Sequence, residues 1–152
     1  MKADLHANRY IQFVTFSCYK RRRLLAPDRA KRIVLGCMGA ELRKAGGWCS
    51  AFVVMPEHVH VLLWFEQKGL LGTFLKAWKR RSSIEIKELR PVFHRYFSSV
   101  PPGDPVWQPN SYVFPIYSQR KLREKINYIH ANPGRAGLTE CPEDWEFSSA
   151  KW

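Results

Sequence analysis

The chain has 152 residues, of which 45% are hydrophobic and 14% aromatic, and this composition indicates a globular domain rather than a disordered chain. Its 25 Lys and Arg against 13 Asp and Glu give a formal net charge of +12, which favours a polyanionic partner. A membrane surface is the rival interpretation of this charge. However, no apolar run reaches the roughly 20 residues of a membrane helix, and the N-terminus lacks the apolar segment of a signal peptide.

The cysteines give a second indication of the protein's environment. They are Cys18, Cys37, Cys49 and Cys141. Their spacing contains no C-x-x-C pair and no cluster typical of a metal site. We interpret them as reduced, mostly buried thiols of a cytoplasmic protein without membrane association. A disulfide framework is the weaker alternative, because nothing else in the sequence indicates secretion.

The N-terminal half predicts a strand, a helix and a hairpin. Residues 9–19 are rich in β-branched and aromatic side chains, as expected for a first strand. Residues 27–45 carry apolar side chains at helical spacing, and Gly46-Gly47 ends that helix. Two strands, 48–55 and 58–65, are separated by a short turn and predict a hairpin.

The C-terminal half predicts two more helices and a weaker strand. A helix is expected over 70–89, with an irregularity at Ser82-Ser83, and a proline-rich loop over 91–105. Residues 106–117 form a strand interrupted by prolines, and 118–132 form the last helix. The order β-α-β-β-α-β-α predicts an α+β fold with a ferredoxin-like, or split βαβ, antiparallel sheet. No linker divides the chain, so we expect one domain over 1–152 with a short tail from about residue 134.

The stretch "MPEHVHVLLWF" places two histidines inside an apolar strand. Alternate side chains of a strand share a face, so His58 and His60 should point the same way and could converge on one metal ion. The alternative is that both are ordinary polar residues at a strand end, hydrogen-bonded to backbone or water. Two ligands do not make a site, so a third is needed.

The last helix offers a third ligand. Its core-facing stripe follows i, i+4, i+7 spacing and consists of Leu122, Ile126 and Ile129. Tyr128 lies off that stripe, with Asn132 one turn further along the same flank, where Lys121 and Lys125 also fall. The alternative is a Tyr that packs by its ring and an Asn that caps the helix before Pro133.

Phosphodiester chemistry connects the two segments. A tyrosine oxygen that attacks a phosphodiester needs alignment with the scissile bond and neutralisation of the phosphate charge, which a divalent ion supplies. Two His and one amide oxygen leave positions for phosphate and water, which suits Mg²⁺ or Mn²⁺, although imidazole would also accept Zn²⁺.

These residues resemble a known family, the single-tyrosine HUH transposases. Within that group the similarity is to the REP-associated tyrosine transposases, and it rests on "MPEHVHVLLWF", "VWQPNSYV", "YIHANPGRAGL" and "EDWEFSSA". The resemblance implies an HUH nuclease fold and metal-dependent cleavage of single-stranded DNA at palindromic hairpin repeats, through a 5′-phosphotyrosine intermediate. It also implies that Tyr128 is the nucleophile and that His58, His60 and Asn132 hold the metal. We expect a monomer rather than a homodimer.

One segment departs from the family pattern. Many relatives carry a Gly-Phe-His-Asp-type segment after the Trp-Gln pair, whereas this chain has residues 109–114, "PNSYVF". No His or Asp is present there, so the departure argues against an auxiliary catalytic or metal-binding role for this segment.

Clusters of cations provide candidates for DNA binding. Cations supply phosphate affinity and aromatic rings can stack on unpaired bases, although each cluster could also be a solvated face. The clusters lie at 20–23, 29–32, 76–81 and 120–125, and Tyr19, Tyr112 and Phe114 are interleaved with them, whereas Trp78 should be core. The residues we predict to bind DNA are Arg21, Arg22, Arg23, Lys79, Arg80, Arg81, Lys121 and Lys125.

Two other functions fit the same sequence. A non-catalytic protein that binds hairpin DNA would need the basic surface but not Tyr128. A hydrolytic metalloenzyme acting on RNA or a phosphate ester would need the metal ligands but not the tyrosine.

Overall fold

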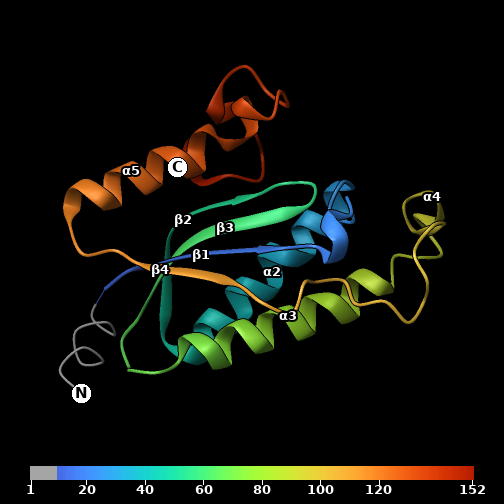
Figure 1. Cartoon of the computed structure of the whole chain (residues 1–152), viewed down its shortest axis with the longest axis horizontal. Helices are drawn as coiled ribbons and strands as arrows, with labels where there is room; N and C mark the ends of the chain where they lie inside the picture. Colours follow the sequence, from blue (N-terminus) through green and yellow to red (C-terminus); the bar gives the residue numbers. More distant parts are fainter. Residues whose placement is uncertain (1–9) are drawn as a thin grey trace.

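A computed structural model describes residues 10–152 of the chain, and its centre is one antiparallel sheet (Figure 1). The sheet has the order β2-β3-β1-β4. Its strands are β1 (Gln12–Ser17), β2 (Gly47–Val54), β3 (His58–Phe65) and β4 (Tyr112–Pro115). This order, with helices between β1 and β2 and between β3 and β4, confirms the predicted α+β, ferredoxin-like arrangement.

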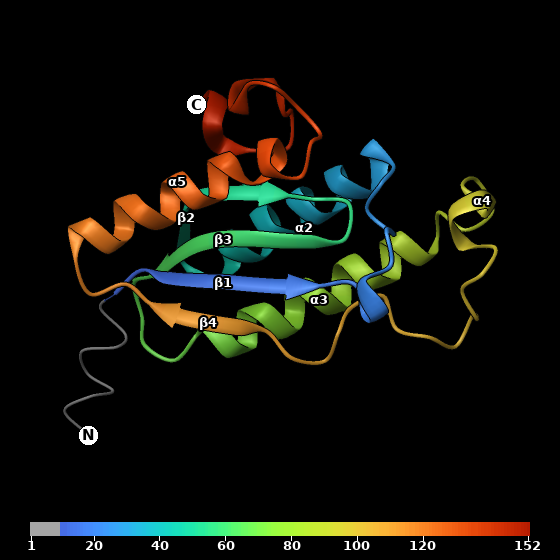
Figure 2. The same ribbon diagram turned by 45° about the horizontal axis from the view of Figure 1, so that its top comes forward.

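Helices cover the two faces of the sheet unequally (Figures 1 and 2). Two long helices, α2 (Asp28–Ala45) and α3 (Leu71–Lys87), pack on one face, and α5 (Gln119–Arg135) crosses the other. The remaining helical segments are short: η1 (Tyr19–Arg21), α4 (His94–Phe97), η2 (Pro142–Asp144) and η3 (Ser149–Lys151). A single helix does not cover a whole sheet face, so part of the α5 face remains open.

The alternation of β3 divides its side chains between the two faces as predicted. The larger core, shared with α2 and α3, contains Val59, Val61, Leu63 and Phe65. Leu62 belongs to the smaller core under α5, where it packs with Phe13 and Ile129. His58 and His60 lie on this second face, and both are nearly buried, with 8% and 5% of their surface exposed.

Several predicted boundaries were wrong. The first strand begins at Gln12 and ends at Ser17, because the chain turns into η1 with positive φ at Lys20 and Arg21; Arg9 lies outside the described residues. The fourth strand covers only Tyr112–Pro115, since prolines before it cannot donate to a ladder. The predicted loop 91–105 contains one helical turn, α4.

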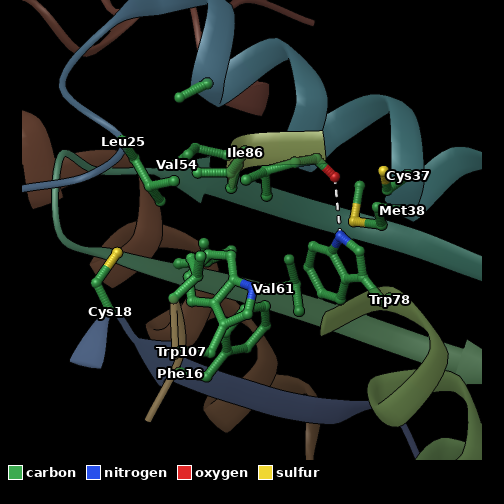
Figure 3. Packing of buried hydrophobic residues seen from close by; sticks show 14 of the residues in the cluster. Phe16, Cys18, Leu25, Cys37, Met38, Val54, Val61, Trp78, Ile86 and Trp107 are labelled. Atoms are coloured by element: carbon green, nitrogen blue, oxygen red, sulfur yellow. Dashed lines mark hydrogen bonds between the residues drawn. The ribbon is translucent and has the colours of Figure 1, made fainter. Parts of the chain in front are cut away.

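No irregularity occurs at Ser82-Ser83, because α3 is continuous there. Ser82 is fully buried, and its hydroxyl donates to the carbonyl oxygen of Trp78 at 2.8 Å. The indole nitrogen of Trp107 in turn donates to Ser82 Oγ at 3.0 Å. Trp78 is core, as expected, and its indole donates to Val34 O at 2.8 Å (Figure 3).

We expect Ser82→Ala to lower the free energy of unfolding by about 1–3 kcal/mol, because it leaves the Trp107 indole nitrogen without a partner in the core. Ser83→Ala is the matched control, since the half-buried neighbouring hydroxyl has no such role, and it should change stability by no more than about 0.5 kcal/mol. Denaturant unfolding of both variants measures the difference. Equal effects would contradict this role of Ser82.

The last helix does not end at Asn132 as predicted, because it includes Pro133 and continues to Arg135. Proline costs one backbone hydrogen bond inside a helix, here the one to the carbonyl of Ile129, and the helix continues for only two residues beyond it. The backbone N–H of Ala136 donates to Asn132 O at 3.1 Å, and Leu138 N–H donates to Pro133 O at 2.9 Å. Asn132 is therefore a helical residue rather than a C-terminal cap.

The C-terminal tail packs against β2 and α5. Val54 N–H donates to Phe147 O at 2.9 Å, and Ser149 Oγ lies 2.9 Å from both Phe52 N and His130 Nε2. Lys31 of α2 is 2% exposed, and its ammonium group lies over the rings of Trp145 and Phe147. Lys31 of the 29–32 cluster is therefore buried rather than part of an exposed cationic surface.

The cysteines are free thiols, as predicted. Cys18 and Cys37 are buried, Cys49 is half-buried and Cys141 is exposed. Within residues 10–152, no helix combines the length and the apolar character that crossing a membrane would require.

Candidate active site and metal centre

The open part of the α5 face is a pocket of about 470 Å³ between that helix and the sheet. Strands β1 and β3 form its floor, α5 forms one wall, and the turn after β1 and the start of β4 complete the rim. Its lining contains the predicted nucleophile and all three predicted metal ligands. The lining residues are Phe13, Thr15, Arg21, His58, His60, Tyr112, Lys125, Tyr128 and Asn132.

The two histidines are adjacent in this pocket. Their ring centroids are 4.7 Å apart and the rings are inclined at 76°. Two side chains at i and i+2 of a strand point the same way, and the antiparallel pairing with β1 fixes their positions opposite Ser17 and Thr15. The rings are thus close enough for both to bind one ion.

Each imidazole is held by a hydrogen bond at Nδ1. His58 Nδ1 donates to Glu57 Oε1 at 2.8 Å, and His60 Nδ1 is bonded to Thr15 Oγ1 at 2.6 Å. In the tautomer with a proton on Nδ1, both Nε2 atoms keep a lone pair for a metal. Burial lowers the pKa of His58, and it lowers the pKa of His60 to about 3, with repulsion from His58 adding to the effect. Both rings are therefore neutral near pH 7, as metal ligands must be.

Asn132 completes the candidate donor set. It is 9% exposed, and its side chain is hydrogen-bonded to His58. Among residues 10–152, no group of three or more His, Cys, Asp or Glu side chains could hold a metal. A metal at this pocket would therefore need the Asn132 amide oxygen as its third protein ligand. Two neutral imidazoles and one amide fit a divalent ion that also binds water or a phosphate oxygen.

Thr15→Val should weaken divalent-metal binding by about 10- to 100-fold, because it removes the hydroxyl that orients the His60 ring. Thr15→Ser keeps the hydroxyl and should retain most of the affinity. Isothermal titration with Mn²⁺ measures both variants, and circular dichroism checks their folding. Wild-type affinity in the Val variant would contradict an orienting role for Thr15.

Tyr128 stands at the mouth of the pocket. Its side chain is 41% exposed, and its ring centroid lies 5.3 Å from that of His60. Lys125 Nζ lies 5.6 Å from the ring centroid, and Arg135 Cζ lies 4.4 Å from it. Arg135 also donates to Tyr128 O at 3.0 Å. A phenol between two cations and beside a metal-competent His pair is well placed to meet a phosphate.

The predicted DNA-binding residues separate into groups. Arg21 and Lys125 line the pocket, and Arg21 forms an ion pair with Glu57 at 3.7 Å. Arg23 also approaches Glu57, at 4.0 Å, whereas Arg22 is paired with Asp104 at 2.8 Å. Lys121 lies outside this pocket and pairs with Glu124. The remaining three belong to α3 on the opposite side of the sheet, and they are Lys79, Arg80 and Arg81.

Sequence reasoning missed two residues that line this pocket and two that contact its predicted ligands or nucleophile. Phe13 and Thr15 could have been found only from the β1–β3 register, because nothing in their local sequence marks them. Glu57 was assigned to the turn, although its position directly before His58 was a signal. Arg135 was missed because the predicted helix ended at Asn132. Arg135 is seven residues after Tyr128, so the two side chains share a face of α5.

Comparison of the sequence with known proteins finds two similar curated proteins. A REP-associated tyrosine transposase of Escherichia coli K12 is 29% identical over 100 residues, which cover 66% of this chain and 52% of that protein. A Haemophilus influenzae protein, provisionally given the same description, is 24% identical over 104 residues, which cover 65% of this chain and 56% of that protein. The chain thus spans about half the length of the curated relatives it matches. No family model matches the sequence.

Comparison of the fold gives a broader match. A REP-associated tyrosine transposase bound to a REP hairpin aligns with a TM-score of 0.75 and 20% identity, over 95% of this chain and 78% of that one. A Deinococcus radiodurans R1 protein, provisionally described as a transposase, aligns with a TM-score of 0.57 and 21% identity, over 78% of this chain and 87% of that one.

The chain therefore has the ferredoxin-like α+β fold of these two solved structures. Within that fold, the similar sequences confirm the resemblance to the REP-associated tyrosine transposases that the motifs indicated.

Proposed function

We propose that the protein is a divalent-metal-dependent endonuclease and strand transferase for single-stranded DNA, with Tyr128 as nucleophile. One observation carries this proposal: the Tyr128 ring lies 5.3 Å from that of His60, in a pocket that also contains His58 and Asn132. A nucleophile, three potential metal ligands and two cations converge there on a space open to a polymer.

The reaction is a transesterification at phosphorus. Tyr128 Oη attacks the scissile phosphate and loses its proton, the P–O3′ bond breaks, and the products are a 5′-phosphotyrosine and a free 3′-OH. Attack of a 3′-OH on the same phosphorus reverses the bond changes and joins two strands. An Mg²⁺ or Mn²⁺ ion bound at this site would neutralise phosphate charge and help to align the scissile bond.

The chain's own residues would divide the remaining work. His58, His60 and Asn132 would hold the ion, and the hydrogen bonds that the two imidazoles donate through Nδ1 to Glu57 and Thr15 would keep the rings oriented. Lys125 and Arg135 flank the phenol ring and would attract the negatively charged phosphate. Because α5 packs on the sheet of the same chain, one copy contains every group that we assign, so a single domain acting as a monomer would suffice.

The substrate follows from the charge and from the relatives. A net charge of +12 favours a nucleic acid, and a pocket of about 470 Å³ with an exposed tyrosine admits an unpaired strand more readily than a duplex. A structurally similar transposase is bound to a REP hairpin. We therefore infer that this protein acts on a single strand next to a hairpin.

Incubation of the protein with an end-labelled single strand that carries a hairpin tests the proposal. With Mg²⁺ or Mn²⁺ we expect a covalent adduct that survives denaturing electrophoresis, and EDTA should abolish it. Binding in gel-shift experiments without any metal-dependent product would favour a non-catalytic hairpin-binding protein. A cleaved strand without an adduct would favour a hydrolytic metalloenzyme.

A further inference from the structure

A second hollow lies on the other side of the sheet, between α3 and the segment 105–111 that leads into β4. It has a volume of about 450 Å³, and its lining includes Lys76, Lys79 and Arg80 but no acidic side chain. We call it the α3 hollow. Its position, on the α2 and α3 side, separates it from the pocket that contains Tyr128.

The three cations of the α3 hollow differ in what they can do. Lys79 is half-buried, and its ammonium group donates to Gln108 O and to Ser111 Oγ, each at 3.0 Å. It therefore holds the 105–111 segment against α3. Lys76 and Arg80 are exposed, and neither is in an ion pair within the described part of the chain.

Arg81 does not take part in this group. It lies on α3 next to Arg80, but it pairs with Glu41 at 3.6 Å and with Glu85 at 3.5 Å. Lys76 and Arg80 are instead four residues apart on one face of α3, and like charges at this spacing repel each other. Two uncompensated cations beside a hollow without acids indicate an anionic ligand.

The short edge strand β4 connects the two hollows. Ser111 lines the α3 hollow, and the next residue, Tyr112, lines the pocket that contains Tyr128, which we call the catalytic pocket. Consecutive side chains of an extended chain point to opposite faces, so only the width of β4 separates the hollows. β4 pairs with β1 alone, so its outer edge has no partner strand within residues 10–152. Tyr112 is 57% exposed and approaches Phe13 edge-on, with ring centroids 6.4 Å apart.

We propose that the DNA strand that leaves the catalytic pocket crosses the edge of β4 over Tyr112 and enters the α3 hollow. There its backbone phosphates bind Lys76 and Arg80, and on the way an unpaired base stacks on Tyr112. This inference rests on the proposed function for the position of the scissile phosphate. It adds a second binding region on the opposite face and a path between the two regions.

Binding measured without cleavage separates this inference from the proposed chemistry. The background is Tyr128→Phe without divalent metal, and the probes are a fluorescent single strand of about four nucleotides and versions extended by about six nucleotides on the 5′ or the 3′ side. Lys76→Ala/Arg80→Ala is the test variant. Arg43→Ala/Lys44→Ala is the control, since it removes two exposed charges of α2 that line neither hollow.

We expect the test variant to bind one of the two extended strands about tenfold more weakly and the short strand within about twofold of normal. The slope of log K against log salt for that extended strand should fall by about 1.4, because each phosphate contact on single-stranded DNA contributes about 0.7. The control pair should lower affinity equally for all lengths. Equal losses on short and extended strands in the test variant, or no loss, would overturn the inference.

The aromatic crossing point has its own test in the same background. Tyr112→Ala should weaken binding of that extended strand by about fivefold or more, and Tyr112→Phe should retain it because the ring still stacks. Unchanged affinity in the Ala variant would rule out the path over β4. If the wild-type protein forms no adduct on any strand, the proposed function fails, whereas the length dependence of binding still decides the path.

Discussion

Tyr128→Phe should reduce covalent attachment to single-stranded DNA by about 10⁴-fold or more, because the phenol oxygen is the atom that forms the bond to phosphorus. The ring itself remains, with its contacts to Lys125 and Arg135, so the affinity for the uncleaved strand should change by less than about threefold. Quantitative denaturing electrophoresis of the adduct and fluorescence anisotropy of the bound strand measure the two effects separately.

The matched control for this variant is Tyr117→Phe, which removes the hydroxyl of another exposed tyrosine. Tyr117 lies just before α5, and 63% of its surface is accessible. It should leave adduct formation unchanged. Adduct formation by Tyr128→Phe at more than a few per cent of the wild-type level would mean that another residue is the nucleophile.

His60→Ala should abolish metal-dependent cleavage and weaken Mn²⁺ binding beyond detection, because it leaves a single imidazole beside the Asn132 amide. The buried ring also packs against Phe13, with centroids 5.5 Å apart, so the Ala variant should be less stable by about 1–3 kcal/mol. A thermal melt therefore has to accompany the activity measurement, and assays should be run well below the lowered melting temperature.

His60→Gln separates the metal effect from the packing effect. Glutamine fills more of the ring's volume than alanine, so part of the lost stability should be recovered. Its amide oxygen is only a weak metal ligand, so cleavage activity should remain at least about 10²-fold below that of the wild type. Recovery of full activity together with stability would indicate that His60 is a core residue hydrogen-bonded to Thr15 and not a ligand.

The sequence predicted those parts of the site that depend on local periodicity. The two-residue period of β3 put His58 and His60 on one face, and the 3.6-residue period of α5 put Tyr128 and Asn132 on one flank. The structure then brings the two segments together, because Leu62 on the histidine face and Ile129 on the helix stripe share one core. Apolar patterning was thus sufficient to predict which face of each segment carries the polar side chains, whereas their meeting was inferred from phosphodiester chemistry and the family resemblance.

The other parts of the site depend on contacts between distant segments. The hydrogen bond between His60 Nδ1 and Thr15 Oγ1 follows from the β1–β3 register, which the two strand sequences do not specify by themselves. Arg135 was hidden by the general rule that proline ends a helix, whereas this helix continues for two residues beyond Pro133. Lys31 is basic in the sequence, yet the aromatic rings of the tail cover it.

The central claim is that Tyr128 becomes joined to DNA with the help of a metal at His58 and His60. The most direct measurement is mass spectrometry of the protein after reaction with a hairpin-bearing single strand and Mn²⁺, followed by nuclease and protease digestion. We predict a nucleotide attached through its 5′-phosphate to the peptide that contains Tyr128, formed with Mn²⁺ and lost with EDTA. A nucleotide on any other residue, or an adduct that forms equally well in EDTA, would contradict this account.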